Sequence, residues 1–165
     1  MIRRPPRSTL SSSSAASDVY KRQVVVRAVE QEEFDAFIAE KVALVEAERM
    51  LTSKVWTKEE LMERGESFYA TNCSACHQAN GKGIPPVFPA LEGSQIALND
   101  ADRHIEILME GVQGSAMAAF GNMYSEVDIA SVITYTRQAW SNGENGDGVI
   151  VTPKDIVDYK NKIDL

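Results

Sequence analysis

Cysteine and histidine are scarce in this chain, whose 165 residues include two of each. Two cysteines cannot supply the framework of several disulfides that holds many small secreted domains together. Long apolar runs are absent as well, because no stretch approaches the ~18 residues of a membrane-spanning helix. The basic N-terminus also lacks the apolar segment of roughly 7–15 residues that a secretory signal contains. The apolar content of 44% and the charged content of 25% are ordinary for a globular domain.

Charge is distributed unevenly along the chain. Residues 1–23 carry five basic groups and one acidic group, whereas residues 24–165 carry 12 basic and 23 acidic groups, a net charge of −11 within the total of −7. An acidic domain repels nucleic acid, and its charge either steers it toward basic partners or only keeps it soluble. The composition leaves these two alternatives open.

Residues 1–23 differ in composition from the rest of the chain. They combine arginine and proline with a run of serine, a low-complexity pattern that cannot bury a core. The segment also resembles translated adapter sequence of the kind found in assembled sequence data. We therefore expect either a non-native tail or a genuinely disordered basic tail, and exclude it from the fold.

Both cysteines lie in one short motif, Cys73-x-x-Cys76-His77. This spacing is the signature of covalent haem attachment, in which the thiols add across the two vinyl groups and the histidine ligates the iron. A redox-active C-x-x-C is typical of a strand-to-helix junction in a βαβ pattern, which the sequence does not show. A structural zinc site needs a second pair of ligands, and His104 is the only other histidine. The motif therefore predicts one covalently bound haem c with His77 as the proximal ligand.

A second axial ligand has to reach the iron from the opposite face. The candidates are Met109, Met117, Met123 and His104. We expect Met109 to pack in the core and His104 to lie on the surface of the same helix. Met117 is the predicted ligand because small residues flank it in a loop that can approach the haem closely, and Met123 is the reserve. A His/Met pair raises the reduction potential, which suits an electron carrier late in a respiratory chain.

The loop after His77 is predicted to supply the acceptor for the second ring nitrogen of that histidine. A carbonyl in the segment Ile84-Pro85-Pro86, with Pro86 as the chosen residue, would fix the tautomer and orientation of the ring. Apolar side chains are expected to exclude water from the haem and so to tune its potential. The candidate wall residues, any one of which could equally be an ordinary core residue, are Phe88, Leu91, Ile96, Ile105, Leu108, Phe120 and Ile133.

Periodicity and capping residues predict a helical chain. Thr57 with Glu60 forms a capping box, and Ser125 with an acidic residue three positions on starts a second helix. Gly65 and Tyr135 are predicted at a close helix crossing, because glycine has no side chain to hold the helices apart. Four units are predicted along the chain. The first two are a tail at 1–23 and a remnant strand at 24–26 with a linker helix at about 30–50. The third is a domain at 57–140, with helices at about 57–73, 101–111 and 125–140 and a loop at 78–98. The fourth is a C-terminal part at 141–165, with a loop, a short strand at 149–151 and a helix at 153–161.

With these motifs in place, residues 57–140 resemble a class I cytochrome c domain. Three segments, residues 72–91, 114–121 and 132–137, are similar to the C-terminal cytochrome domain of bacterial cytochrome c oxidase subunit II. In addition, residues 24–26 and 32–34 resemble the segment that follows the copper domain of that family. The resemblance covers about residues 24–160 and departs from the usual pattern at Ala118, where many cytochromes have proline.

The resemblance implies an all-α class I cytochrome c domain in an N-terminally truncated subunit II. Its function would be electron transfer, with other oxidase subunits and a donor cytochrome or quinol-oxidising complex as partners and with no catalytic centre in this chain. The family's dinuclear copper would belong to a missing upstream domain, and the expected location is the periplasmic face of the bacterial inner membrane. The alternative is a soluble periplasmic electron shuttle or the cytochrome domain of a dehydrogenase.

Overall fold

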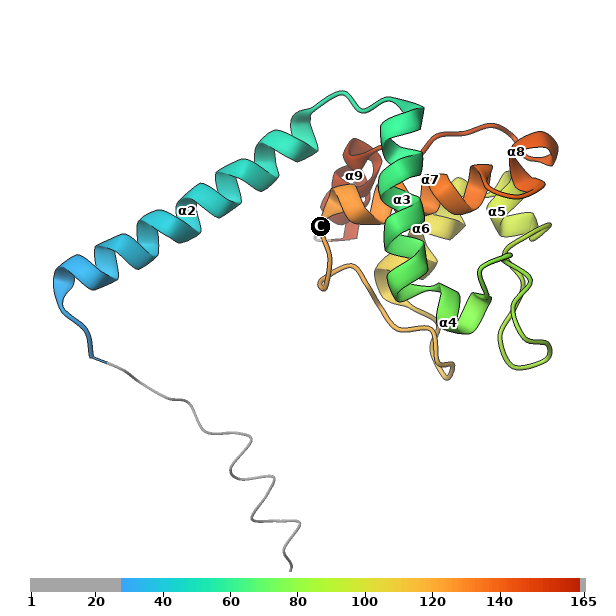
Figure 1. Cartoon of the computed structure of the whole chain (residues 1–165), viewed down its shortest axis with the longest axis horizontal. Coiled ribbons are helices and arrows are strands. Elements are labelled where there is room, and N and C mark those ends of the chain that lie inside the picture. Colours follow the sequence, from blue (N-terminus) through green and yellow to red (C-terminus); the bar gives the residue numbers. More distant parts are fainter. Residues whose placement is uncertain (1–27, 164–165) are drawn as a thin grey trace, which may run out of the picture. The chain divides into compact units, whose positions relative to one another are not determined.

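The computed structural model describes residues 28–163, and the helices of this part of the chain carry the fold (Figure 1). The predicted tail at 1–23 and the predicted strand at 24–26 lie outside the described residues. The helices are α2 (Gln31–Ser53), α3 (Lys58–Asn72), α4 (Ser74–His77), α5 (Gln95–Asn99), α6 (Ala101–Glu110), α7 (Glu126–Gln138), α8 (Asn142–Asn145) and α9 (Pro153–Ile163). Within residues 28–163 the only β pairing is an isolated bridge between Ile84 and Phe88. The predicted all-α class is confirmed.

The chain divides into two compact units, residues 1–41 and residues 42–165. The linker helix expected at about 30–50 is present as α2, and none of its residues is buried. Large apolar side chains such as Phe37 and Val45 are exposed on it, by 52% and 67%. No helix within the described residues has the length and apolarity needed to span a membrane.

The domain in residues 42–165 begins with the predicted capping box. The Thr57 Oγ1 atom accepts a hydrogen bond from the Glu60 amide at 3.2 Å, and Glu60 Oε2 accepts one from the Thr57 amide at 2.9 Å. Two amide groups that the first turn of a helix leaves unpaired are thereby satisfied. This arrangement fixes the residue at which α3 begins.

Helices α3 and α7 cross (Figure 1). Gly65 lies at this crossing, as the sequence predicted. A Cβ atom placed on Gly65 would lie 2.1 Å from the Ser131 carbonyl oxygen and 2.7 Å from the Tyr135 Cβ atom. Glycine therefore allows the two backbones to approach more closely than any other residue would.

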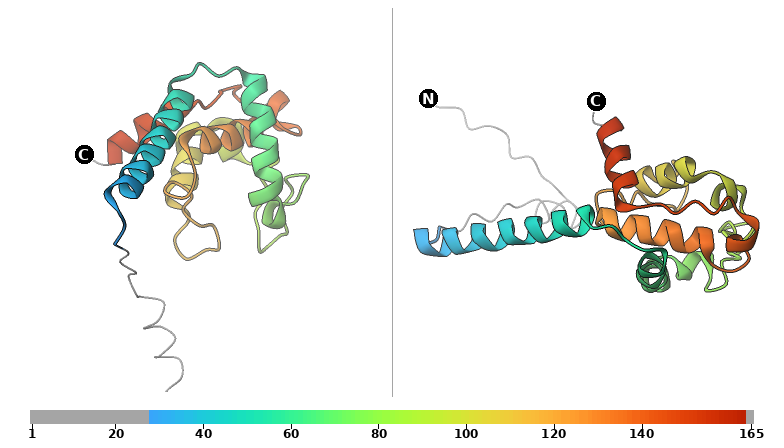
Figure 2. Two further views of the ribbon diagram at one scale, coloured as in Figure 1. Left: turned by 60° about the vertical axis from the view of Figure 1, so that its left-hand side comes forward. Right: turned by 90° about the horizontal axis from the view of Figure 1, so that it is seen from above.

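The hydrophobic core lies where α6, α7 and α9 meet, and α9 packs on α7 (Figure 2). Met109 is 7% exposed in this core, which confirms its predicted role in packing. Ile105 and Ile133, which the sequence offered either as haem-wall or as ordinary core residues, belong to the core and do not line the cavity described below. The core residues are Ile105, Met109, Ile129, Ala130, Ile133, Val151 and Ile156.

The short strand predicted at 149–151 is wrong, because this segment pairs with a side chain instead of another strand. Thr134 Oγ1 donates to the Val151 carbonyl at 2.8 Å and accepts from the Val151 amide at 3.0 Å. Val151, which is 2% exposed, is thus held against α7, whereas Val149 at the start of the run is exposed. The predicted loop at 78–98 likewise includes the short helix α5, whose Ala97 and Leu98 are buried.

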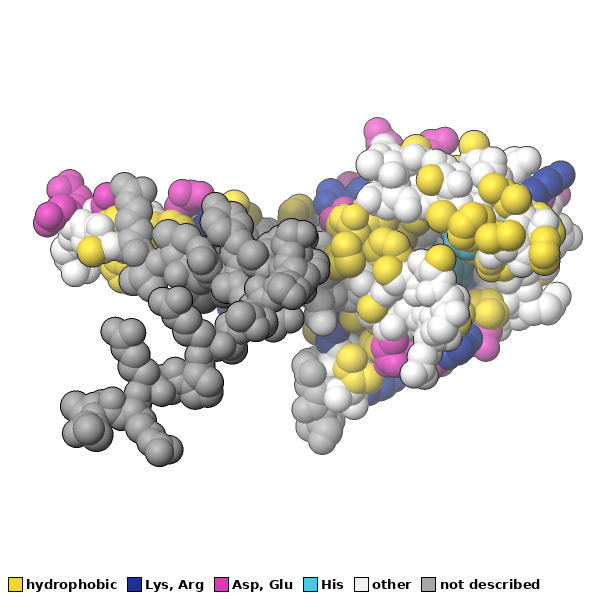
Figure 3. Space-filling model, turned by 90° about the horizontal axis from the view of Figure 1, so that it is seen from below, with side chains coloured by type: hydrophobic (Ala, Val, Ile, Leu, Met, Phe, Trp, Pro, Cys, Tyr) yellow, Lys and Arg dark blue, Asp and Glu magenta, His cyan; other side chains and the backbone are white. Residues whose placement is uncertain are grey.

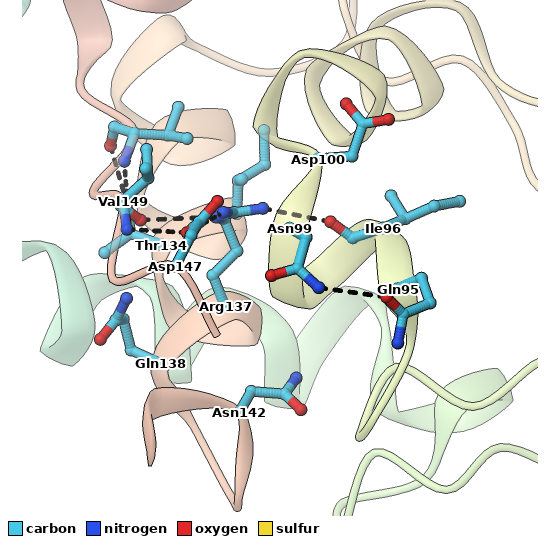
Figure 4. A network of polar contacts seen from close by, with 12 residues as sticks. Gln95, Ile96, Asn99, Asp100, Thr134, Arg137, Gln138, Asn142, Asp147 and Val149 are labelled. Atoms are coloured by element: carbon cyan, nitrogen blue, oxygen red, sulfur yellow. Dashed lines mark hydrogen bonds and ion pairs between the residues drawn. The ribbon is translucent and has the colours of Figure 1, made fainter. Parts of the chain in front are cut away.

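A buried guanidinium joins α7 to α5 and to the segment before α9 (Figure 4). The Arg137 side chain is 1% exposed, and its Nη2 atom lies 2.5 Å from Asp147 Oδ1. Its other nitrogens donate to the carbonyls of Ile96 at 3.1 Å and Val149 at 3.4 Å. A buried charge with an ion-pair partner and carbonyl acceptors is tolerated where an isolated one would not be.

Replacing Gly65 with alanine is expected to destabilise the protein. The added methyl group meets backbone atoms of α7 that cannot rotate away, so overpacking of roughly 1–3 kcal/mol should outweigh the higher helix propensity of alanine. Chemical denaturation followed by circular dichroism measures the change. The exposed Ala70→Gly variant on the same helix reports propensity alone, and a Gly65→Ala protein as stable as the original would contradict the close crossing.

Candidate functional site

The two cysteines and His77 are held together by a single helical turn. Cys73 caps the end of α3 through its amide, which donates to the Tyr69 carbonyl at 2.9 Å. The next turn, α4, closes with the His77 amide donating to the Cys73 carbonyl at 2.9 Å. Residues three and four positions apart lie on one face of a helix, so Cys76 and His77 are on the same face of this turn as Cys73.

This face borders a cavity of about 570 Å³, which is within the usual size range of small-molecule sites. Figure 3 shows the hollow, with hydrophobic side chains at its border and histidine atoms inside it. Both cysteines are free thiols and line it, together with His77 and Met117. Five of the seven predicted wall residues also line it, namely Phe88, Leu91, Ile96, Leu108 and Phe120.

The acceptor for the His77 ring is the carbonyl of Pro89, at 2.9 Å from Nδ1. The prediction of Pro86 was therefore wrong. The reason is the bridge between Ile84 and Phe88, whose amides each donate to the other's carbonyl at 2.9 Å. This bridge places Pro86 in the turn between its two ends, and the chain returns to His77 only at Pro89. The contact still performs the predicted task, because an Nδ1–H that donates to a carbonyl leaves Nε2 free for a metal.

Aromatic side chains fix the chain just after His77. The Tyr69 hydroxyl donates to the Gln78 carbonyl at 2.7 Å, and the Trp140 Nε1 atom donates to the Ala79 carbonyl at 3.2 Å. The Tyr69 and Trp140 rings contact each other edge to face, with centroids 5.4 Å apart. The loop that orients the histidine is thereby anchored on α3 and on the residues after α7.

Met117 lines the cavity from the loop between α6 and α7. Its carbonyl accepts from the Val112 amide at 3.0 Å, which closes the loop. Gly111 allows this closure, because a Cβ atom there would lie 2.7 Å from the Met117 carbonyl oxygen. Met123, the reserve candidate, is 63% exposed and does not line the cavity.

His104 is buried, so the prediction of a surface residue was wrong. Its side chain lines the cavity, it is only 4% exposed, and its Nδ1 atom has no hydrogen-bond partner within the described residues. Burial, with smaller contributions from Arg137 and His77, lowers the pKa of His104 to about 4. The imidazole is therefore neutral near pH 7. Helix α6 has a marked apolar side, and His104 sits beside buried Ile105 on it.

The electrostatics of Cys73 differ from those of the reactive cysteine in a redox-active C-x-x-C. Burial, together with the neighbouring Cys76, raises the pKa of Cys73 to about 11. Redox cysteines have a lowered pKa because the thiolate is the nucleophile. In the described part of the chain, no group of three or more His, Cys, Asp or Glu side chains is placed to hold a metal ion.

Comparison with known proteins identifies the family. Residues 60–135 match the family described as cytochrome c oxidase, cbb3-type, subunit III. The chain is also 33% identical over 98 residues to cytochrome c-552 of Thermus thermophilus, a match that covers 51% of this chain and 73% of that protein. The chain belongs to the cytochrome c family. Membership of this family implies a covalently bound haem c and electron transfer with other redox proteins or complexes.

Two further relatives show how widely this domain is used. The cytochrome c6 of Petalonia fascia is 32% identical over 84 residues, which are 48% of this chain and 98% of that protein. The cytochrome c subunit of the quinone-dependent alcohol dehydrogenase of Gluconobacter oxydans is 27% identical over 92 residues, which are 50% of this chain but 19% of that subunit. The cytochrome domain thus occurs alone and as a small part of larger subunits.

The residues of the cavity fit a haem c. The thiols of Cys73 and Cys76 lie beside His77, whose Nδ1 atom is held by the Pro89 carbonyl. The Met117 thioether comes from another loop, and most of the other residues that line the cavity are apolar. These are the donor types that hold haem iron in cytochromes c.

Proposed function

We propose that Cys73 and Cys76 attach one haem c, that His77 and Met117 ligate its iron, and that the domain carries electrons within cytochrome c oxidase subunit II. The observation that supports the first two parts is the shared cavity: both thiols, His77 and Met117 border the same space of about 570 Å³. Thiols for attachment, an imidazole and a thioether are the complete set that such a centre needs.

The side chains of this domain hold, orient and shield the cofactor. Bound haem supplies an iron that alternates between the ferric and ferrous states. The Pro89 carbonyl orients His77, and the apolar wall excludes water, which lowers the local dielectric and tunes the potential. Because no bond-making chemistry is required, the protein contributes ligation, orientation and electrostatics.

The oxidase role rests on the resemblance of residues 24–160 to subunit II, whose cytochrome domain follows a copper domain. On this proposal the electron acceptor is a dinuclear copper centre outside this sequence, and the domain works at the periplasmic face of the bacterial inner membrane. The helix α2 supports a fused arrangement, because its 23 residues precede the cytochrome domain and none of them is buried.

A dehydrogenase subunit or a free shuttle is the second candidate. It is favoured by the similarity to the Gluconobacter oxydans dehydrogenase subunit and to the Petalonia fascia cytochrome c6. In either case the haem centre would be the same, and only the donor and the acceptor of electrons would differ.

Replacing both Cys73 and Cys76 with serine should abolish covalent haem. We expect the original protein, produced together with haem-ligation machinery, to keep haem absorbance on a denaturing gel. The double variant should lose all of it because thioether bonds no longer form. Haem staining after electrophoresis is the measurement, with Ser74→Ala as the matched control, and haem retention by the double variant would contradict the attachment site.

Replacing Met117 with alanine should remove the thioether ligand. The expected results are loss of the near-infrared methionine–iron band and a lower midpoint potential, because thioether ligation favours ferrous iron. The exposed Met123→Ala variant is the control and should keep both properties. If Met117→Ala retains the band, the assignment of the second ligand is wrong.

Sequencing the source DNA upstream of the codon for Val24 separates the two functional roles. For oxidase subunit II, we expect two apolar spans and a copper-binding C-x-x-x-C with nearby histidine and methionine. A short export signal directly before that codon would contradict this role and support a free carrier.

A further inference from the structure

The methionine loop, residues 111–124 with Met117 among them, is joined by one hydrogen bond to the part of the domain that carries the thiols. The Tyr124 hydroxyl donates to Asn72 Oδ1 at 2.8 Å. Asn72 is the last residue of α3 and directly precedes Cys73, whereas the tyrosine ends the loop. In the described part of the chain, no other hydrogen bond joins this loop to α3 or α4.

The ring of Tyr124 contacts an aromatic side chain on each side of this junction. It meets the Phe68 ring of α3 edge to face, with centroids 4.7 Å apart, and it stacks on the Phe120 ring of the loop at 5.7 Å. Phe68, Asn72 and Phe120 all line the cavity, whereas Tyr124 does not. The tyrosine therefore connects wall residues of two elements without lining the cavity itself.

The other hydrogen bonds of the methionine loop, within the residues described, stay inside it or reach α6. The Val112 amide donates to the Met117 carbonyl at 3.0 Å, and the Phe120 amide donates to the Leu108 carbonyl of α6 at 2.8 Å. Bonds inside the loop can persist when the loop moves away from α3. The same movement has to break the hydrogen bond to Asn72, so this bond opposes opening of the loop.

We propose, building on the proposed ligation of haem iron by Met117, that Tyr124 is a positioning residue that holds the methionine loop closed through its bond to Asn72. A competing ligand reaches the iron only when the loop has released its methionine. The apparent affinity of such a ligand is therefore reduced by the small fraction of protein in the open form. The affinity of an added ligand thus reports how firmly the loop is held.

The test measures the apparent dissociation constant of imidazole for the oxidised, haem-loaded protein. Loss of the near-infrared methionine–iron band follows the replacement of methionine by imidazole. Tyr124→Phe keeps both ring contacts and removes only the hydroxyl. Thr134→Val is the matched control, because it removes a hydroxyl that bonds the Val151 backbone, outside the methionine loop and the cavity wall.

We expect Tyr124→Phe to bind imidazole about 2- to 12-fold more tightly, the ratio that corresponds to one hydrogen bond of ordinary net strength. Thr134→Val should lower resistance to denaturant and leave the imidazole affinity unchanged. Asn72→Ala should also tighten binding, and the double variant should bind less tightly than the product of the two single effects predicts, because both remove the same bond. The Val112 amide should exchange with solvent faster in Tyr124→Phe.

Three results would overturn the proposed role of Tyr124. An unchanged imidazole affinity in Tyr124→Phe would show that loop opening leaves this bond intact. An equal gain in Thr134→Val would show a general loss of stability, and multiplicative effects with Asn72→Ala would show that the two residues act separately.

A haemochrome assay and a near-infrared spectrum of the original protein come before any imidazole is added. Absence of covalent haem, or of the methionine–iron band, would refute the proposed attachment or the proposed ligation by Met117, and the role of Tyr124 with it. These two failures are visible without any variant, so they are distinguished from the three results that concern Tyr124 alone.

Discussion

The helices of this domain are arranged around a space that the chain itself does not fill. A cavity of about 570 Å³ adjoins a core of seven buried residues, so much of the apolar surface faces the cavity instead of other side chains. Apolar surface is stabilising only when it is removed from water. Helices α4 and α6 and the Met117 loop therefore form one wall, and a bound cofactor would remove the apolar surface of this wall from water.

A close backbone crossing and a buried side-chain network fix the helices next to the cavity. Gly65 brings α3 and α7 together, and the Arg137 network ties α7 to α5, whose Ile96 borders the cavity. Gly65 and Arg137 do not themselves line the cavity. The scaffold is thus stabilised by polar and close-packed groups, whereas the cavity side stays apolar except for His104 and a few other polar groups.

Local signals allowed much of this structure to be predicted from the sequence. The C-x-x-C-H motif and the capping box at Thr57 each depend on residues close together in the chain. The crossing at Gly65 depends on the absence of a side chain at glycine. The acceptor at Pro89 and the burial of His104 were not predictable in this way. The first depends on a turn closed by the bridge at Ile84, and the second on helices that pack together only in the folded chain.

The contact between Gly65 and Ser131 joins residues 66 positions apart, and this separation has a kinetic consequence. The intervening chain has to close as a loop before α3 and α7 can meet, and the entropy of closure is lost before any packing is gained. A haem bonded at α4, directly after α3, would give the later segments an apolar surface to collapse on. The order of assembly would then be attachment first and docking of α7 afterwards.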